Sequence, residues 1–268
     1  MTRLVGSLLI LTMHVFGLCT AFSQERVSYA KRIVLGVPVH VVTVNLNSPH
    51  VRISPALARH GVGTSEGFGS MLSRLQPTAA ITGTFFCMKS LLPVGDIVID
   101  SNRIVKGTVG TGLCFGPDNR VDVINLGDPR SVEWPGYTSV ICSGPRLVTN
   151  GATSLYPRPE GFYDRALFRK ARRSAIGVTQ ANKLLMVTVN RPIYLSKLAQ
   201  IMQHLGAVDA INLDGGTSTA LYFKGRVPSH PGRSLTNLIV VYESPEKFAR
   251  VKATLAPTPV IASRGSRS

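Results

Sequence analysis

The chain contains one segment whose residue types and spacing suit acid–base or nucleophilic chemistry. An apolar run over residues 210–213, typical of a β-strand, ends directly on the carboxylate of Asp214. The residues that follow are small and rich in donors: Gly215, Gly216, Thr217, Ser218 and Thr219. Glycine allows a sharp turn that brings backbone N–H groups close to a ligand, and a rigid strand end holds a reactive group in place. A tight turn with Asp214 as an ordinary turn residue explains the same pattern, so this segment alone leaves both interpretations open.

Few other carboxylates are candidates for a second acidic group. The chain has 14 Asp and Glu residues, and most of them lie in polar turns or at strand ends. Asp96, which precedes the apolar run 97–99, is our second candidate, although a turn cap is the favoured interpretation there. Glu160 and Asp164 lie in a charged, irregular insertion over residues 151–172, where we expect a solvated loop.

Two arginines have contexts that would suit an anion. Arg146 and Arg173 each lie beside small residues at the edge of an apolar strand, and a guanidinium can hold a phosphate or carboxylate through two hydrogen bonds. Taken singly, each also fits an ordinary surface arginine of a basic protein. A further basic cluster over residues 165–173, with Phe168 among the cations, indicates either a polyanion-binding patch or a solvated loop.

Composition places the chain among exported globular proteins. Of its 268 residues, 44% are hydrophobic, enough for one sizeable domain. Residues 1–23 resemble a secretion signal, with Arg3 before an apolar run too short for an ordinary membrane span. We therefore expect a signal over 1–23, a domain over 24–250 and a flexible tail over 251–268. The protein would be secreted or periplasmic, with no transmembrane span after signal removal.

The charge balance indicates an anionic partner. The formal net charge is +16, from 30 Lys and Arg against 14 Asp and Glu, which favours anionic glycan, anionic lipid or nucleic acid. For an exported protein we expect no nucleic acid. The cysteines that follow the signal are Cys87, Cys114 and Cys142, and one pair could form a disulfide. Neither cysteine nor histidine spacing favours zinc. We predict no certain cofactor, although a structural Ca²⁺ or Mg²⁺ stays open, as does the oligomeric state.

The hydrophobic pattern predicts an α+β fold of mostly antiparallel short strands with one long and one short helix. A short helix is expected within residues 64–77, and a longer one over 194–205, where Leu195, Leu198, Met202 and Leu205 form a single apolar stripe. The strands are expected over residues 32–35, 37–46, 51–57, 79–86, 93–105 as a hairpin, 111–116, 120–126, 137–149, 175–178, 184–189, 210–213 and 238–242.

Taken in order, these segments resemble the phosphodiester glycosidase family over roughly residues 30–245. The motifs that carry the resemblance are Thr82-Gly-Thr-Phe-Phe86 followed by Pro93-Val-Gly95, Gly144-Pro-Arg-Leu147, Arg173-Ser-Ala-Ile-Gly177, Leu205-Gly-Ala207 and Asn212-Leu-Asp-Gly-Gly-Thr-Ser218. Each motif is short, but five in the same order make the resemblance fairly specific. Two positions depart from the family pattern: Thr82 replaces an asparagine, which puts specificity or activity in doubt, and Thr217 replaces a glycine.

The resemblance implies hydrolysis of a sugar-1-phosphodiester at its anomeric carbon, and we expect such a substrate in a bacterial envelope glycan. Asp214 would act as nucleophile or general base, with Asp96 as the second carboxylate. The implied substrate-binding residues are Thr82, Gly83, Arg146, Arg173, Asn212, Gly215, Gly216, Thr217 and Ser218. Two alternatives stay open: a non-catalytic basic envelope protein that binds polyanionic glycan, and a phosphodiesterase that cleaves the P–O bond, for which the chain offers no evident metal cluster.

Overall fold

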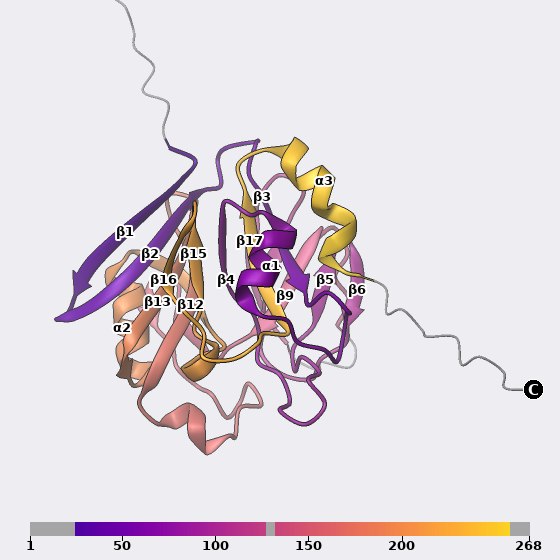
Figure 1. Ribbon diagram of the computed structural model, residues 1–268. Coiled ribbons are helices and arrows are strands. Elements are labelled where there is room, and N and C mark those ends of the chain that lie inside the picture. The colour runs from indigo at the N-terminus through magenta and orange to yellow at the C-terminus, as the bar shows by residue number, and fades with distance from the viewer. Residues whose placement is uncertain (1–24, 127–131, 258–268) are drawn as a thin grey trace, which may run out of the picture.

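The computed structural model describes residues 25–126 and 132–257 (Figure 1). Within them the chain forms three sheets, whose strands pair antiparallel, and three α-helices. The predicted α+β class with mostly antiparallel strands is confirmed. The predicted signal over residues 1–23 lies outside the described residues, as do residues 258–268 of the predicted tail.

The largest sheet has seven strands and carries the segment that ends on Asp214. Its strands, in spatial order, are β1 (Val27–Val34), β2 (Val37–Asn45), β13 (Lys183–Ile193), β12 (Ala171–Thr179), β14 (Ala207–Leu213), β10 (Arg146–Thr149) and β11 (Ala152–Thr153). Successive residues of β13 alternate between two hydrophobic cores: Leu184 and Met186 join one, while Leu185 and Val187 join the other. The centre of this sheet is therefore buried on both faces, which explains its unbroken apolar runs.

Two five-stranded sheets pack with one face of the large sheet in a common core. One consists of β16 (Arg226–Ser229), β15 (Leu221–Phe223), β4 (Ala79–Thr82), β17 (Asn237–Tyr242) and β3 (Arg52–Leu57). The other consists of β6 (Asn102–Val105), β5 (Ile97–Ile99), β9 (Ser139–Ser143), β7 (Thr111–Phe115) and β8 (Val121–Asn125). Most predicted strands are present, but β15 and β16 were not predicted, and the strand predicted over 137–149 is divided between β9 and β10.

The helices correct the prediction of one long and one short helix. The structure has α1 (Phe68–Leu75) and α2 (Leu195–His204) where helices were predicted, and a third, α3 (Pro245–Leu255), which is the longest. Helix α2 packs against β10, β12 and β14 and covers the second face of the large sheet. Helix α3 extends to Leu255, so residues 251–255, which were predicted to belong to a flexible tail, are helical.

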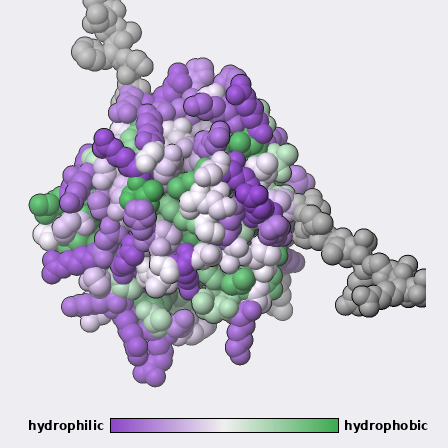
Figure 2. Space-filling model, in the orientation of Figure 1, coloured by the Kyte–Doolittle hydropathy of each residue, from purple (hydrophilic) through white to green (hydrophobic). Residues whose placement is uncertain are grey.

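The surface agrees with the composition. In the view of Figure 2 most of the molecule is hydrophilic, with scattered hydrophobic areas, one of them at the left edge over the end of the β1–β2 hairpin. The charged insertion contains β11 and a short 3-10 helix, η1 (Arg165–Phe168), and is otherwise irregular, as predicted. Among the described residues no helix is long and apolar enough to cross a membrane.

Candidate active site

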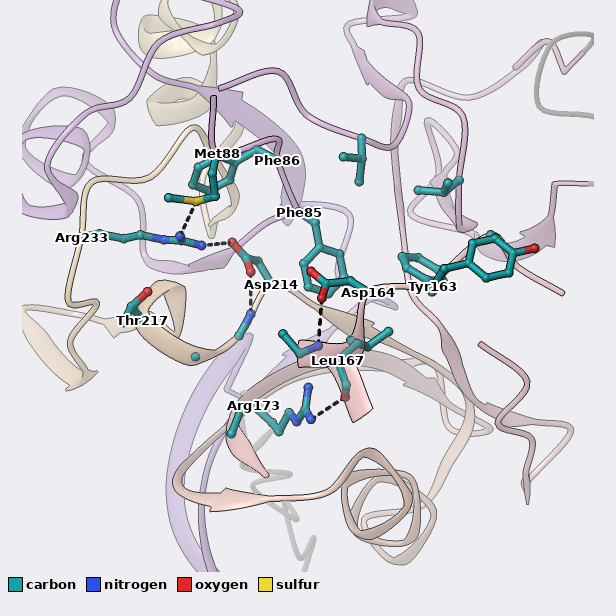
Figure 3. Close-up of a pocket in the computed structure, with 18 of the residues that line it drawn as sticks. Phe85, Phe86, Met88, Tyr163, Asp164, Leu167, Arg173, Asp214, Thr217 and Arg233 are labelled. Carbon is teal, nitrogen blue, oxygen red and sulfur yellow. Dashed lines mark hydrogen bonds and ion pairs between the residues drawn. The ribbon is translucent and has the colours of Figure 1, made fainter. Parts of the chain in front are cut away.

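A pocket of about 520 Å³ opens at the end of β14 (Figure 3). Its walls come from segments that are distant in sequence: the loop after β4, the insertion before β12, and the small-residue loop after β14. The charged residues in its lining are Asp164, Arg173, Asp214 and Arg233. Asp214 and Arg173, which the sequence analysis selected separately, therefore share one pocket.

Asp214 is held at the pocket floor by hydrogen bonds to its own loop. Its side chain is almost fully buried, and Oδ1 accepts a hydrogen bond from the N–H of Gly215 at 2.8 Å. Oδ2 lies 3.3 Å from Nη2 of Arg233, and the Ser218 hydroxyl also bonds the carboxylate. Burial raises the pKa of Asp214 above its ordinary value, although Ser218, Arg233 and the Gly215 N–H oppose that shift. Such a carboxylate is more basic than one in water, as a general base or nucleophile requires.

Arg233 is a pocket residue that the sequence analysis missed. Its Nε donates to Oγ of Ser218 at 2.7 Å, and its guanidinium lies over the ring of Phe86, 4.6 Å from the centroid. Nη1 also lies 2.8 Å from Sδ of Met88. These contacts fix the cation beside Asp214 at the rim of the pocket (Figure 3). No local pattern marks Arg233, because its partners come from the loop after β4 and from the Asp214 segment.

Arg173 is a buried cation without a carboxylate partner among the described residues. Only 3% of it is exposed, and its Nη2 donates to the carbonyls of Leu167 at 2.8 Å and Arg169 at 2.5 Å. Its Nε donates to the Ile193 carbonyl at 3.3 Å. Burial lowers the pKa of Arg173 to about 10, so the group is still positive at neutral pH. An unpaired buried charge is costly, and a bound anion would supply the missing counter-charge.

The loop after Asp214 needs its glycines. A Cβ on Gly215 would lie 2.8 Å from the Arg172 carbonyl, so β12 can approach only a glycine there. Gly216 has φ of +57°, in the left-handed region that favours glycine. It begins a short 3-10 turn, η2 (Gly216–Ser218), in which Thr217 faces the pocket while Ser218 is buried beneath it. The predicted loop residues are thus in place, although Ser218 reaches the site only through Asp214 and Arg233.

Asp96 lies outside the pocket lining, in a buried structural network. Its carboxylate accepts hydrogen bonds from Nε1 of Trp134 at 2.7 Å and from the N–H of Gly107 at 2.6 Å, and pairs with Arg103 at 3.1 Å. Every strong interaction of the group is therefore directed to a strand or loop of the third sheet. The proposal of Asp96 as a second catalytic carboxylate is not supported by this geometry.

Arg146 is likewise absent from the pocket lining. Its Nη2 pairs with Oδ1 of Asp209 at 2.7 Å, and its Nη1 donates to Oδ1 of Asn125 at 3.1 Å. These contacts tie β10 to β14 and to the edge of the third sheet. The guanidinium that faces the pocket beside Asp214 is instead that of Arg233.

Three further predicted residues lie behind the pocket rather than in its lining. Asn212 is buried in β14, where its Nδ2 donates to the Gly144 carbonyl at 3.0 Å. Thr82 is buried at the end of β4. Gly83 follows it, and its carbonyl accepts the N–H of Asp214 at 3.0 Å. They support the strand ends that carry the site, so their effect on a ligand is indirect.

Gly83→Ala is expected to lower the free energy of unfolding by about 2 kcal/mol. The added Cβ would lie 1.9 Å from Oδ1 of Asn237, the atom that accepts the N–H of Thr84 at 2.8 Å. Moving that amide would shift the backbone that holds Asp214. Urea unfolding measures the effect, with Gly69→Ala as the control, because a Cβ there meets nothing within 4 Å and stabilises a helix. Equal midpoints for Gly83→Ala and the wild type would contradict the prediction.

The charged insertion forms a wall of the pocket, so the expectation of a solvated loop around Glu160 was wrong. Glu160 accepts the N–H of Arg146 at 2.9 Å and the hydroxyl of Thr111 at 2.7 Å, and its burial raises its pKa. Nearby, Phe162 packs edge-on against Phe85, with 5.9 Å between ring centroids. Asp164 is exposed as predicted, but it lines the pocket and caps η1 through the N–H of Ala166 at 2.8 Å.

No group of three or more His, Cys, Asp or Glu side chains within the described chain could hold a metal ion. Cys87 is exposed and Cys114 and Cys142 are buried, and all three are free thiols, so the disulfide considered from the sequence is not formed.

The pocket joins a buried carboxylate to two cationic side chains, an arrangement suited to a hydrolase that acts on a phosphorylated substrate. Residues 76–242 match the family model described as phosphodiester glycosidase, which is more than half of the chain. The chain therefore belongs to the phosphodiester glycosidase family, and the resemblance drawn from its motifs is confirmed. The family description implies a hydrolase that acts on phosphodiester glycosides.

Solved structures share the fold at low sequence identity. A hypothetical protein from Synechocystis is similar with a TM-score of 0.69 at 18% identity, over 80% of this chain and 61% of that chain. This chain thus spans less than two thirds of that protein. The catalytic domain of zebrafish N-acetylglucosamine-1-phosphodiester alpha-N-acetylglucosaminidase, auto-inhibited by its pro-peptide, is similar with a TM-score of 0.65 at 16% identity, over 81% and 82% of the two chains. No curated protein sequence matches the chain.

Proposed function

We propose that this protein hydrolyses the anomeric C–O bond of a sugar-1-phosphodiester, with Asp214 as nucleophile or general base. The observation that carries the proposal is the pairing, in one pocket, of a buried carboxylate of raised pKa with a buried arginine that has no carboxylate partner among the described residues. The carboxylate would act at the anomeric carbon, and the arginine would hold the phosphate. Water supplies the hydroxyl of the released sugar, and the phosphate leaves as a monoester.

The arginines assigned to the phosphate are Arg173 and Arg233, in place of the Arg146 expected from the sequence. Fixed cations near a leaving phosphate stabilise the negative charge that develops as the C–O bond breaks. A phosphate monoester is a better leaving group than a sugar alkoxide and needs less protonation as it departs. One carboxylate that acts at the anomeric carbon can therefore suffice. The carboxylate placed to assist, if two act together as in most glycosidases, is Asp164 on the pocket wall rather than Asp96.

The cellular setting is part of the proposal. The segment over residues 1–23 and the formal charge of +16 support export to a compartment rich in anionic glycans. A sugar phosphodiester of a bacterial envelope glycan would meet the enzyme there, and a secreted or periplasmic location follows. The non-catalytic alternative predicts binding of the same glycans without turnover.

Product analysis tests the reaction directly. The protein is incubated with an N-acetylglucosamine-1-phosphodiester, with and without a chelator, and the products are separated. Free sugar with a phosphomonoester supports C–O cleavage, whereas sugar-1-phosphate indicates P–O cleavage and contradicts the proposal. Binding of anionic glycan with no product from a panel of sugar phosphodiesters would instead favour the non-catalytic alternative.

Arg233→Gln is expected to move the acid limb of the pH–rate profile to higher pH. Asp214 must be ionised to act as base or nucleophile, so activity is lost as the pH falls through its folded-state pKa. The positive charge of Arg233 lowers that pKa, so its removal raises it further. The profile of kcat/KM against pH measures the shift, and Arg226→Gln, an exposed arginine outside the pocket lining, is the control. An unmoved or lowered acid limb would contradict the role of Asp214.

A further inference from the structure

The hairpin of β1 and β2 ends in a turn that presents aliphatic side chains to solvent. Val34 pairs with Val37, which leaves Leu35 and Gly36 as a two-residue turn. Both have positive φ, +52° and +75°, as a type I′ turn requires. Asn, Asp or Gly normally occupies the first of these positions, so a leucine there goes against the local backbone preference.

Leu35 joins none of the hydrophobic clusters formed by the described residues. Leu35 is 42% exposed, and Ile33, on the strand before the turn, is 79% exposed, the most exposed of the large hydrophobic residues described. Pro38, opposite Ile33 in the strand register, is exposed as well. A residue that breaks a local rule without a packing gain marks a functional position more often than a structural one.

Basic side chains lie directly behind the apolar tip. Lys31 and Arg32 are both exposed, and neither forms an ion pair with a residue that the structure describes. In Figure 2 the hydrophobic surface over the end of the hairpin adjoins hydrophilic surface. Aliphatic side chains at a projecting tip, followed by cations, match the depth order of a lipid surface, with acyl chains below anionic headgroups.

Strand register places this tip at the pocket end of the large sheet. Arg32 pairs with Val39 on β2, and Thr188 of β13 pairs with His40, one residue further along β2. The neighbouring Val189 pairs with Arg173 on β12. The next residue of β12 pairs with Leu213, which precedes Asp214. By this register the hairpin tip lies at the same strand end of the large sheet as Asp214. Figure 1 shows the hairpin of β1 and β2 projecting from the rest of the ribbon at that tip.

We infer that the β1–β2 tip docks the protein on an anionic phospholipid bilayer, with Ile33 and Leu35 entering the interface and Lys31 and Arg32 contacting headgroups. A soluble anionic polysaccharide explains the cations but not the aliphatic tip, because sugars stack on flat aromatic rings, which the tip lacks. The inference rests on the hairpin alone and does not depend on the proposed reaction. A protein docked in this way would hold its pocket close to the membrane surface.

Vesicle flotation tests the inference. The exported protein, with its N-terminus established by mass spectrometry, is mixed with vesicles of phosphatidylcholine alone or with an equal part of phosphatidylglycerol. We expect binding to the anionic vesicles and about tenfold weaker binding after Ile33→Ser or Leu35→Asn. Lys31→Gln with Arg32→Gln should weaken it similarly. All variants share one N-terminus, so differences between them report on the hairpin.

Two controls separate docking from folding and from general charge. Leu35→Asn installs the preferred residue of a type I′ turn, so its melting temperature should equal or exceed that of the wild type while binding falls. Lys247→Gln with Arg250→Gln removes the same charge from exposed positions on α3 and should leave binding within about twofold. Any one of three results would overturn the inference. The first is full vesicle binding by Ile33→Ser and Leu35→Asn, and the second is an equal loss of vesicle binding in the α3 double variant. The third is a wild-type dimer that these tip variants convert to a monomer.

Discussion

Asp214→Asn is expected to lower kcat/KM for a sugar-1-phosphodiester by at least about a thousandfold while the protein stays folded. The substitution keeps the shape of the side chain and leaves an oxygen to accept the Gly215 N–H, which lies 2.8 Å from Oδ1 in the wild type. It removes the negative charge and the basicity, and it puts an amide NH2 group in place of Oδ2, the oxygen that lies 3.3 Å from Nη2 of Arg233 in the wild type. Because burial disfavours the ionised form of Asp214, a neutral isostere should not weaken the fold at neutral pH. The variant should therefore lose activity in steady-state kinetics while its melting temperature stays close to that of the wild type.

Asp209→Asn is the matched control for that experiment. Asp209 lies on the same strand, and its Oδ1 pairs with Arg146 at 2.7 Å rather than facing the pocket. We expect some loss of stability, because Arg146 loses the partner of a mostly buried ion pair, and nearly unchanged kcat/KM, because Asp209 lies outside the pocket lining. Full activity in Asp214→Asn would remove Asp214 from the mechanism. Equal losses in both variants would show that the effect spreads through β14 rather than through chemistry.

The predictable parts of the fold are those that depend on local sequence. The apolar stripe of α2 and the strand that ends on Asp214 were predicted because residues close in sequence determine them. Helix α3 was missed because few of its side chains are buried, Leu255 among the exceptions. Its start was nevertheless marked in the sequence: Ser244 caps the helix by accepting the N–H of Lys247, and Pro245 occupies its first turn.

The residues of the site could not be predicted to the same extent. A charged side chain can bind a ligand only if no residue distant in sequence already pairs with it. Arg146 and Arg173 have similar local sequences, but β14 brings Asp209 to the first and brings no carboxylate to the second. The carboxylate of Asp96 accepts a hydrogen bond from Trp134, which is 38 residues away in the sequence. Arg233, which donates to Asp214, is 19 residues away in the sequence. These pairings follow from the order of strands in the sheets, which periodicity does not specify.

Arg173→Gln is expected to lower kcat/KM by roughly a hundredfold to a thousandfold, the cost of losing one fixed donor to a developing negative charge. Burial lowers the pKa of Arg173 to about 10, which means that the surroundings disfavour its charged form in the unliganded protein. An anion in the pocket would offset part of that effect. Anion binding is therefore favoured partly because it relieves the unfavourable burial of the unpaired Arg173 charge.

This reasoning gives the variant a second readout, independent of turnover. Inorganic phosphate at a hundredfold excess over its dissociation constant should stabilise the wild type by about 2.7 kcal/mol and raise its melting temperature by roughly 5–10 °C. Arg173→Gln should lose that rise, whereas Arg146→Gln, whose guanidinium is paired with Asp209 outside the pocket, should keep both the rise and the activity. A phosphate-dependent rise that is lost in Arg146→Gln and kept in Arg173→Gln would place the anion site at Arg146 and contradict the prediction. A rise lost only from Arg173→Gln would identify the unpaired cation as the anion-binding group, because both variants remove one positive charge from the same sheet and differ in whether a carboxylate already neutralised it.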